Sequence, residues 1–491
     1  MIKLNLKTPF FLFLLPVFFV LHGFMQNYDF VPVKDAILLT EMYMGFAVLF
    51  SLLFRLLFKD FTRANLVALF IMAFHFFFGS IHDFLKKAAP GSFAIKYSFI
   101  IPGIFVLLLV LVIFLKTRKK PLVKTARYLN VLFLVFIIAD TAMLGIKIIR
   151  NKKEKIKSVP EGISACANCP KPDIYFIIAD EYVGNSTLKE QFHFDNTGFT
   201  QELADRGFHT IPYSRSNYNY TPFSIASTFK MDYLNLEAAH KKLQPDLVLC
   251  YETIRDNDWL TFLLYHGYRL HNYSIFDFEG QPARTREAFL PAKTKLITSQ
   301  TFISRFDKEV RYNFVTRWKS ESELRRLTYN SLKNNNNIYN LTWKIAEEKL
   351  PDPKFIFTHL HLPHYPYYFD KDGKERPFET LLEGNQVNKE LYIGYLQYGN
   401  RKYLELIDHI LKHAEKPPVI ILMGDHGFRH FPDSVEKKYT YLNHISIYLP
   451  GKNYASFTDS LTNVNFFRTM LNAEFSQHMP MLKDSVIFIK E

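Results

Sequence analysis

Five apolar stretches within the first 150 residues constrain the fold of this chain more than any other feature. They cover residues 9–25, 36–58, 64–81, 98–115 and 129–149. Each has about the ~17–25 residues that a helix needs to cross ~30 Å of hydrocarbon. The first follows Lys3 and Lys7, as in a signal peptide, but it lacks a small-residue cleavage site and four more spans follow. The sequence therefore predicts an all-α, membrane-integral bundle of five transmembrane helices over residues 1–150.

The positive charge of the chain is concentrated in this region. Residues 1–160 hold 21 of the 60 Lys and Arg residues but only 7 of the 47 Asp and Glu residues. The rest of the chain is near neutral, so the net charge of +13 belongs to membrane flanks and not to a polynucleotide groove. We expect no nucleic-acid partner.

The short connections predict the orientation of the spans. The chain start and the second and fourth connections carry 11 Lys and Arg residues, whereas the first and third connections carry 4. The richer set is expected in the cytoplasm, and an odd number of spans then leaves the rest of the chain on the far side. The basic run 150–157 fits this poorly, although a large following domain weakens the rule there. We expect a multi-pass protein of the cytoplasmic (inner) membrane with an extracytoplasmic domain.

Some polar residues lie inside the predicted spans, among them Glu41, His75 and Asp140. A charged group is costly in hydrocarbon, so such residues form either a path for lipid substrate or protons or a hydrogen bond between helices. Both interpretations remain open from the sequence.

The pattern changes after a linker at residues 151–170, where Cys166 and Cys169 form either a small disulfide or two unpaired thiols. Short apolar runs at 173–179, 354–360, 418–423 and 445–449 predict buried strands, and residues 386–414 predict a helix. The tract Asn334–Asn337 is interpreted as a loop. Strands that alternate with helices predict an α/β domain over residues 171–491, with a mostly parallel central sheet flanked by helices.

Metal-binding residue types follow three of these strands. Asp180 and Glu181 come after the first, His361 and His364 after the second, and Asp425 and His426 after the third. In such sheets ligands bind beyond the carboxyl ends of the strands, and carboxylate and imidazole groups bind Zn²⁺ or Mn²⁺. The coincidence predicts a metal site at this edge.

These segments resemble the alkaline phosphatase/sulfatase superfamily over residues 170–491. PDIYFIIADEY is similar to the opening strand with its metal-binding acid, GDHG to the closing Asp-His pair, and HLPHYPYYFD to a segment with a phosphate- or sulfate-binding His. The five-span region resembles the anchors of lipid A phosphoethanolamine transferases and lipoteichoic acid synthases. The resemblance implies an alkaline phosphatase-like fold and a metal-dependent enzyme.

The expected nucleophile lies in the segment SNYNYTPFSIASTFKMDYL. Sulfatases place Cys or Ser ahead of x-Pro-x-Arg, which is absent here, whereas Thr221 lies where the membrane phosphotransferases have an unmodified Thr. A bound cation can activate a hydroxyl, and a helix start at Pro222 can hold an anionic phosphoryl group. The alternatives are that Thr221 only caps the helix, or that Ser224 is the nucleophile.

By resemblance, one divalent cation is bound by Asp180, Thr221, Asp425 and His426, with Glu181 as a further ligand. We expect Zn or Mn rather than Ca or Mg. The resemblance implies that His364 binds either the transferred group or a second cation. Weaker substrate-side candidates are His359, which could instead face the core, His361 and His444. Arg429 either neutralises substrate charge or is a solvated loop residue.

Three functions remain. The leading one is transfer of a phosphoethanolamine or phosphoglycerol group from a membrane phospholipid donor to an envelope glycan or lipid acceptor through Thr221. The second is hydrolysis of a phosphate or sulfate ester at the same metal centre. The third is a catalytically silent membrane scaffold, which the complete set of metal ligands disfavours.

Overall fold

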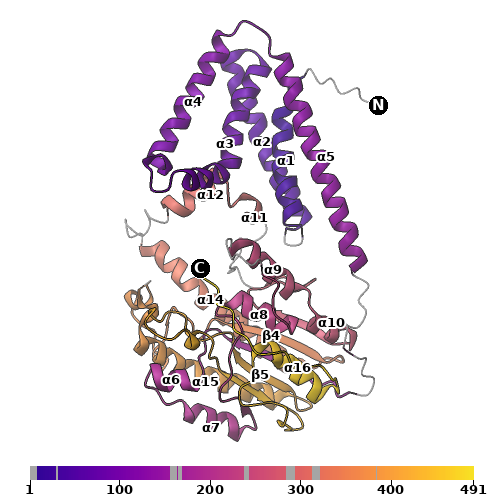
Figure 1. The fold of residues 1–491 in the computed structure, drawn as a ribbon, viewed down its shortest axis with the longest axis vertical. Coiled ribbons are helices and arrows are strands. Elements are labelled where there is room, and N and C mark those ends of the chain that lie inside the picture. The colour runs from indigo at the N-terminus through magenta and orange to yellow at the C-terminus, as the bar shows by residue number, and fades with distance from the viewer. Residues whose placement is uncertain are drawn as a thin grey trace. The chain divides into compact units, whose positions relative to one another are not determined.

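The computed structural model describes residues 8–28, 31–154, 163, 169–236, 243–283, 294–311, 321–382 and 384–490. The chain divides into two compact units (Figure 1). The first comprises residues 1–156 together with 291–320, and the second comprises residues 157–290 and 321–491. The later segment of the first unit has no apolar span of its own, and nothing in its local sequence predicted its association with the N-terminal helices.

The first unit is helical. Its helices are α1 (Phe11–Gln26), α2 (Val33–Phe58), α3 (Phe61–Ala88), η1 (Phe93–Ile95), α4 (Tyr97–Thr117), α5 (Val123–Glu154), α11 (Lys295–Thr298), α12 (Phe302–Phe306) and the π-helical turn η2 (Asp307–Arg311). Among the described residues, α2 to α5 are long and apolar enough to cross a membrane. With 16 residues, α1 extends only ~24 Å. The prediction of five full spans is therefore not exact: all five apolar helices form, but the first is short.

Polar contacts join helices within this unit. His22 Nδ1 lies 3.2 Å from both carboxylate oxygens of Asp140, which links α1 to α5. The interhelical hydrogen bond expected as one alternative for Asp140 is thus present. In α3, the backbone N–H of Gly79 donates to the carbonyl oxygen of Gln300 at 2.8 Å, and Arg305 pairs with Asp83. A Cβ atom at position 79 would overlap Gln300, so glycine allows the returning segment to approach.

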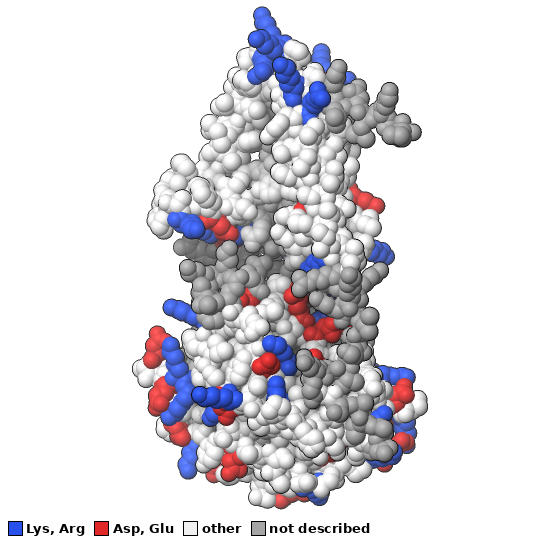
Figure 2. Space-filling view, turned by 45° about the vertical axis from the view of Figure 1, so that its right-hand side comes forward, with Lys and Arg blue, Asp and Glu red and all other residues white. Residues whose placement is uncertain are grey.

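The charges of the first unit are unevenly spread. Figure 2 shows basic side chains gathered at the end where α4 and α5 are joined, and mainly uncharged atoms along the helices. This distribution is that of a helical bundle with apolar sides and a basic flank.

The second unit contains a six-stranded sheet with the order β2-β6-β5-β1-β4-β3. The strands are β1 (Ile174–Ala179), β2 (His209–Thr210), β3 (Arg269–Tyr273), β4 (Lys354–Leu360), β5 (Val419–Gly424) and β6 (Ile445–Tyr448). β3, β4, β1 and β5 run parallel, but β6 pairs antiparallel with both β5 and β2. The sheet is therefore mixed, which corrects the prediction of a mostly parallel sheet: the fourth predicted strand exists but runs in the opposite direction.

Helices cover both faces of this sheet. They are α6 (Asn185–Gln191), α7 (Thr197–Asp205), α8 (Thr221–Lys230), α9 (Leu243–Arg255), α10 (Asp258–Tyr265), α14 (Glu321–Glu347), α15 (Lys389–His413) and α16 (Asn463–Glu474), with short 3₁₀ turns η3 (Phe378–Leu381), η4 (Asn385–Val387) and η5 (Lys437–Thr440). Alternate residues of β1 face opposite layers, because successive strand side chains point to opposite faces. Ile177 packs in the core with residues of α15, whereas Phe176 contacts Phe229 of α8 and Phe467 of α16.

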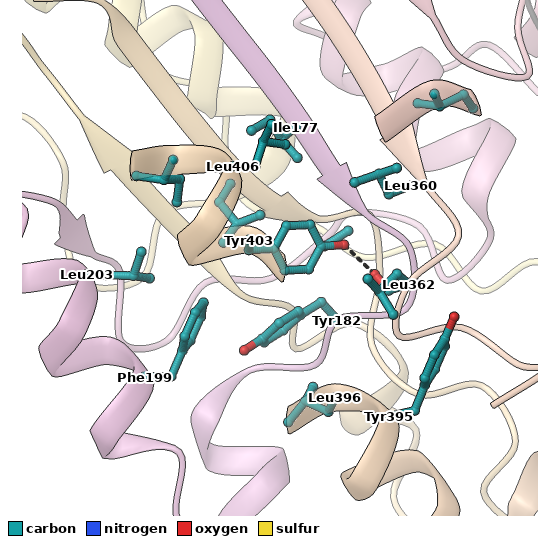
Figure 3. Close-up of a cluster of buried hydrophobic side chains, with 14 of the residues drawn as sticks. Ile177, Tyr182, Phe199, Leu203, Leu360, Leu362, Tyr395, Leu396, Tyr403 and Leu406 are labelled. Atoms are coloured by element: carbon teal, nitrogen blue, oxygen red, sulfur yellow. Dashed lines mark hydrogen bonds between the residues drawn. The ribbon is translucent and has the colours of Figure 1, made fainter. Parts of the chain in front are cut away.

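The core on the α15 face reaches the loop that follows β4. The hydroxyl of Tyr403 in α15 donates to the carbonyl oxygen of Leu362 at 2.6 Å (Figure 3). Tyr182, just after β1, is fully buried in the same cluster. The loops that follow β1 and β4 are therefore anchored by packing and do not project freely from the sheet.

One local prediction is wrong: the tract Asn334–Asn337 is not a loop but lies inside α14. Asn has low helix propensity, but the long amphipathic helix around the tract packs against β4 and overrides it. The side chain of Asn335 is buried and bonds both backbone groups of His361, through Nδ2 to the carbonyl oxygen (2.8 Å) and through Oδ1 from the N–H (2.7 Å). The tract thus positions a residue of the predicted site.

Candidate metal centre and nucleophile

The register of the sheet brings the three predicted strand ends together. Ala179 at the end of β1 is paired with Leu360 of β4 on one side and with Gly424 of β5 on the other. The residues that follow these three positions, Asp180, His361 and Asp425, therefore leave the sheet at the same level. This confirms the geometric basis of the prediction that these strands converge at one edge.

The first cluster consists of Asp180, Asp425 and His426, all buried. Each offers one ligand atom, and these atoms lie within 4.8 Å of one another. His426 Nε2 is 3.4 Å from Asp425 Oδ2 and 3.2 Å from Thr221 Oγ1. Two ligands bound to a tetrahedral ion at ~2.0–2.1 Å lie ~3.3 Å apart, so these separations fit a shared cation.

The protonation of His426 supports this arrangement. Its Nδ1 lies 2.7 Å from the carbonyl oxygen of Gly427, which can only accept, so Nδ1 carries the proton and Nε2 keeps a lone pair. That lone pair faces the carboxylate of Asp425, whose Oδ2 accepts no hydrogen bond among the described residues. A buried carboxylate oxygen opposite an imidazole lone pair requires a cation or a proton between them. The residues present therefore fit a divalent metal.

Glu181 adds a third buried carboxylate in an unusual backbone conformation. Its φ of +59° is left-handed, which is strained for a residue with a long side chain. Its N–H donates to Asp425 Oδ1 at 2.9 Å, its Oε1 accepts from the backbone N–H of Arg429 at 3.0 Å, and its Oε2 has no hydrogen bond among the described residues. Burial raises the pKa of Glu181 to about 8, against an opposing effect of Arg429, with the charges of Asp180 and Asp425 raising it further. A bound cation would reverse this shift.

A second cluster lies beside the first. Glu181, His364 and His430 place ligand atoms within 4.8 Å, as do Asp180, His361 and His364. His361 Nε2 is 3.5 Å from Asp180 Oδ2, and the rings of His361 and His364 stack at 4.1 Å. His430 was not found from the sequence, because a His six residues after a strand end is brought back only by the path of its loop.

His364 is better suited to accept than to donate. Its Nδ1 bonds the carbonyl oxygen of Tyr365, so Nε2 keeps a lone pair. Burial lowers the pKa of His364 well below its usual range, and the neighbouring His361 and His430 lower it further. A neutral imidazole with this tautomer can bind a cation or take a proton, but it offers no N–H to a phosphoryl oxygen. Of the two expectations for His364, this favours the cation.

Thr221 is the first residue of α8, and the N-cap is Tyr220, whose side chain makes no capping bond. Thr221 is therefore not the N-cap, contrary to the alternative that it only caps the helix. Ser224, the rival nucleophile, donates its hydroxyl to the carbonyl oxygen of Asp425 and accepts from Asn463 Nδ2. Through these bonds Ser224 supports the turn that carries Asp425 and His426, whereas Thr221 Oγ1 lies 3.2 Å from His426 Nε2.

The glycines of the GDHG segment are explained by close packing. A Cβ atom at Gly424 would overlap the carbonyl oxygen of Tyr182, and one at Gly427 would overlap the carbonyl oxygen of Tyr439. Asn443 Nδ2 also donates to the Gly424 carbonyl oxygen. The turn that carries Asp425 and His426 is therefore enclosed by backbone on both sides.

The remaining predicted residues, His359, Arg429 and His444, differ in how close they lie to the first cluster. His359, in β4, contacts Asp180 with Nε2 at 3.1 Å and stacks on Phe276, so it faces the first cluster from within the sheet. The guanidinium of Arg429 lies over the ring of Tyr220 at 4.3 Å, next to Thr221. His444 is buried against Tyr182 and Phe199 and bonds Ser446 at 2.8 Å. The structure thus brings together the predicted residues except His444, whose partners belong to the core.

Comparison with known proteins gives structural neighbours only. No family model matches the sequence, and no curated protein matches it. Solved structures similar to the chain include the periplasmic domain of EcEptC from Escherichia coli in complex with Zn (12% identity, 63% of this chain and 84% of that chain, TM-score 0.39). Another is the integral membrane lipooligosaccharide phosphoethanolamine transferase A from Neisseria meningitidis (11%, 94% and 95%, TM-score 0.37).

A third neighbour is BT33494S-sulf, from glycosaminoglycan metabolism in Bacteroides thetaiotaomicron (15% identity, 62% of this chain and 72% of that chain, TM-score 0.35). The solved structures similar to this chain thus include phosphoethanolamine transferases and a sulfatase.

Proposed function

We propose that this chain is a membrane-bound, metal-dependent enzyme that transfers a phosphoryl-linked group, phosphoethanolamine or phosphoglycerol, with Thr221 as the nucleophile. One observation carries the proposal: Thr221 Oγ1, at the start of a helix, lies 3.2 Å from His426 Nε2 in a buried cluster with Asp425 and Asp180. Three side chains that can bind a metal ion lie beside this hydroxyl, and a metal ion bound there would activate it as a nucleophile.

The residues that would hold the metal are Asp180, Thr221, Asp425 and His426, with Glu181 beside them. When bound, a divalent ion such as Zn²⁺ lowers the pKa of a hydroxyl and offsets negative charge on the phosphoryl group. In the first step Thr221 Oγ forms a bond to phosphorus, and the bond from phosphorus to the diacylglycerol oxygen breaks. In the second step the acceptor hydroxyl attacks the same phosphorus, and Thr221 is released.

Other residues of the chain support these steps. In the first turn of α8, Pro222 has no N–H and the N–H groups of Phe223 and Ser224 donate to the carbonyl oxygen of Tyr220, so side chains have to balance an anionic group next to Thr221. Arg429, over Tyr220, brings a positive charge to the same place. His364 Nε2, with its lone pair, can bind a second cation beside the first. The α2–α5 helices would hold a phospholipid donor in the membrane, and the acceptor would be an envelope glycan or lipid.

Hydrolysis of a phosphate or sulfate ester is the second candidate, because the same centre acts on water if no acceptor binds. A catalytically silent scaffold is disfavoured, since buried carboxylates without a cation would destabilise the fold with no benefit. We place the catalytic domain on the extracytoplasmic side of the inner membrane, where such donors and acceptors meet.

The test is to incubate the purified full chain in detergent with headgroup-labelled phosphatidylethanolamine, with and without an acceptor lipid, and with added Zn²⁺ or Mn²⁺. Transferase activity predicts diacylglycerol release and label on the acceptor, and chelation should abolish both. Free labelled headgroup without acceptor would indicate the hydrolase. No turnover under any condition, or full turnover in an Asp425→Ala/His426→Ala variant, would contradict the proposal.

A further inference from the structure

A second group of metal-binding side chains lies at the opposite edge of the sheet. α14 ends at Glu347, seven residues before β4 begins, and α15 ends at His413, six residues before β5 begins. Both helix ends therefore lie at the amino edge of the sheet, whereas the candidate metal centre is at the carboxyl edge. No step proposed for Thr221 uses these residues.

Three side chains converge there. His409 and His413 are four residues apart on α15 and so lie on one face of the helix. Glu347 reaches them from α14, and one ligand atom from each of the three lies within 4.8 Å of the others. His409 Nε2 is 3.3 Å from Glu347 Oε1, which is the ~3.3 Å expected for two ligands of one tetrahedral ion at ~2.0–2.1 Å.

The imidazoles are held in place by their surroundings. His413 Nδ1 bonds the carbonyl oxygen of His409 at 2.8 Å, so Nδ1 carries the proton and Nε2 keeps the lone pair that a metal needs. The ring of His409 stacks on Trp343 with centroids 3.6 Å apart and planes at 20°, and only 8% of the residue is exposed. Glu347, by contrast, is half-exposed, so an ion can enter from solvent.

The backbone adds a negative potential at the same point. The last turns of α14 and α15 both end at this cluster, and each helix C-terminus carries about half a negative charge on unpaired carbonyl groups. The carbonyl oxygen of Trp343, in the last turns of α14, lies 3.2 Å from His409 Nε2, so without a metal this Nε2 carries the proton, which a bound cation would displace. A cation would therefore contact one carboxylate and two imidazoles, and it would lie near the negative ends of two helices.

We propose that Glu347, His409 and His413 bind one transition-metal ion of the Zn²⁺ type, which joins α14 to α15 as a structural link apart from the reaction centre. Two imidazoles and one carboxylate suit Zn²⁺, Co²⁺ or Ni²⁺, whereas Mg²⁺ and Ca²⁺ prefer oxygen ligands. The alternative is an ordinary ion pair between Glu347 and His409 with no bound metal. The proposal does not depend on the function of the Thr221 centre.

The experiment measures bound metal in the full chain in detergent, after equilibration with Zn²⁺ and removal of excess ion. His413→Ala and Glu347→Gln each remove one ligand at a half-buried or exposed position, which leaves the packing of Trp343 intact. We expect both variants to retain one Zn²⁺ fewer per chain than the wild type. Zn²⁺ should also raise the unfolding temperature of the wild type more than that of either variant, and Mg²⁺ should not.

His478→Ala is the matched control, because this exposed histidine lies outside both clusters. Its zinc content should equal that of the wild type. The same zinc content in wild type, His413→Ala and Glu347→Gln would overturn the proposal, and so would an equal loss in His478→Ala, which would indicate nonspecific surface binding. Because the measured quantity is bound metal, the result is independent of whether the chain transfers phosphoryl groups.

Discussion

At the scale of single residues, the site depends on which lone pairs its histidines keep. His426 and His364 each donate Nδ1–H to a backbone carbonyl, of Gly427 and Tyr365, so both keep a lone pair on Nε2, which in His426 faces Asp425. A backbone carbonyl cannot donate in return, which makes this tautomer independent of the metal. The chain therefore prepares its imidazoles as ligands before any ion binds.

Residue types and strand ends predicted much of this site. Asp180, Asp425 and His426 directly follow predicted strands, so the register alone brings them together. His430 and Asn335 could not be predicted in the same way, because one depends on a loop path and the other on a helix that the Asn tract seemed to interrupt. His444 precedes a predicted strand, but its side chain faces the core. The identity of a single residue does not show whether its side chain faces the site or the core.

The burial of His444 predicts a pH dependence of stability. Burial lowers its pKa from 6.5 to about 3, so between these values the unfolded chain binds one more proton than the folded chain. The contribution to stability is therefore lost as the pH falls below 6.5, by about 2 kcal/mol at pH 5. We expect the free energy of unfolding of the full chain in detergent to fall more steeply from pH 7 to 5 than that of His444→Gln. Parallel curves for the two proteins would show that His444 does not titrate on unfolding.

At the scale of elements, α8 and the turn after β5 act as one unit. Ser224, one turn after Thr221, donates to the carbonyl oxygen of Asp425, and Asn463 at the start of α16 bonds Ser224. Asn443 bonds both Gly424 and Asn463 from the segment before β6. These buried side chains fix Thr221 relative to Asp425 and His426. The sequence did not predict this network, because its members are distant in the chain and only the mixed sheet brings the β6 segment beside β5.

Removal of the Ser224 hydroxyl tests this coupling. Ser224→Ala takes a donor from a buried carbonyl group, which costs about 1–3 kcal/mol of stability. We expect a lower free energy of unfolding and a higher zinc concentration for half-maximal activity, with turnover retained once the metal is saturating. Ser227→Ala is the control, since the hydroxyl of Ser227 donates to the carbonyl oxygen of Ser224 within α8. Complete loss of turnover in Ser224→Ala at saturating zinc would instead make Ser224 the nucleophile.

At the scale of the whole molecule, the chain combines a helical unit and an α/β unit that are not simple consecutive segments. Residues 294–311 pack against α3 through the Gly79–Gln300 and Asp83–Arg305 contacts. Hydropathy identified the apolar helices because each span is encoded locally. It could not assign this later segment, because such an association depends on contacts between residues more than 200 positions apart.

The orientation of the helical unit gives a prediction for the whole molecule. The basic residues gather where α4 and α5 are joined, so we expect that connection to lie in the cytoplasm. A reporter active only outside the cytoplasm should therefore work when fused after residue 170 and fail when fused near Lys120. The reverse pattern would place the α/β unit inside the cell and remove the argument for an envelope substrate.

Mass spectrometry of the trapped chain shows whether Thr221 forms the proposed covalent phosphoryl-linked intermediate. After brief incubation with phosphatidylethanolamine, zinc and no acceptor, the peptide that contains Thr221 should gain the mass of the headgroup phosphoryl unit. Thr221→Ser should keep a measurable fraction of this adduct, while Thr221→Ala and the Asp425→Ala/His426→Ala variant should show none. An adduct on Ser224 or another residue, or an unmodified peptide during active turnover, would contradict the account.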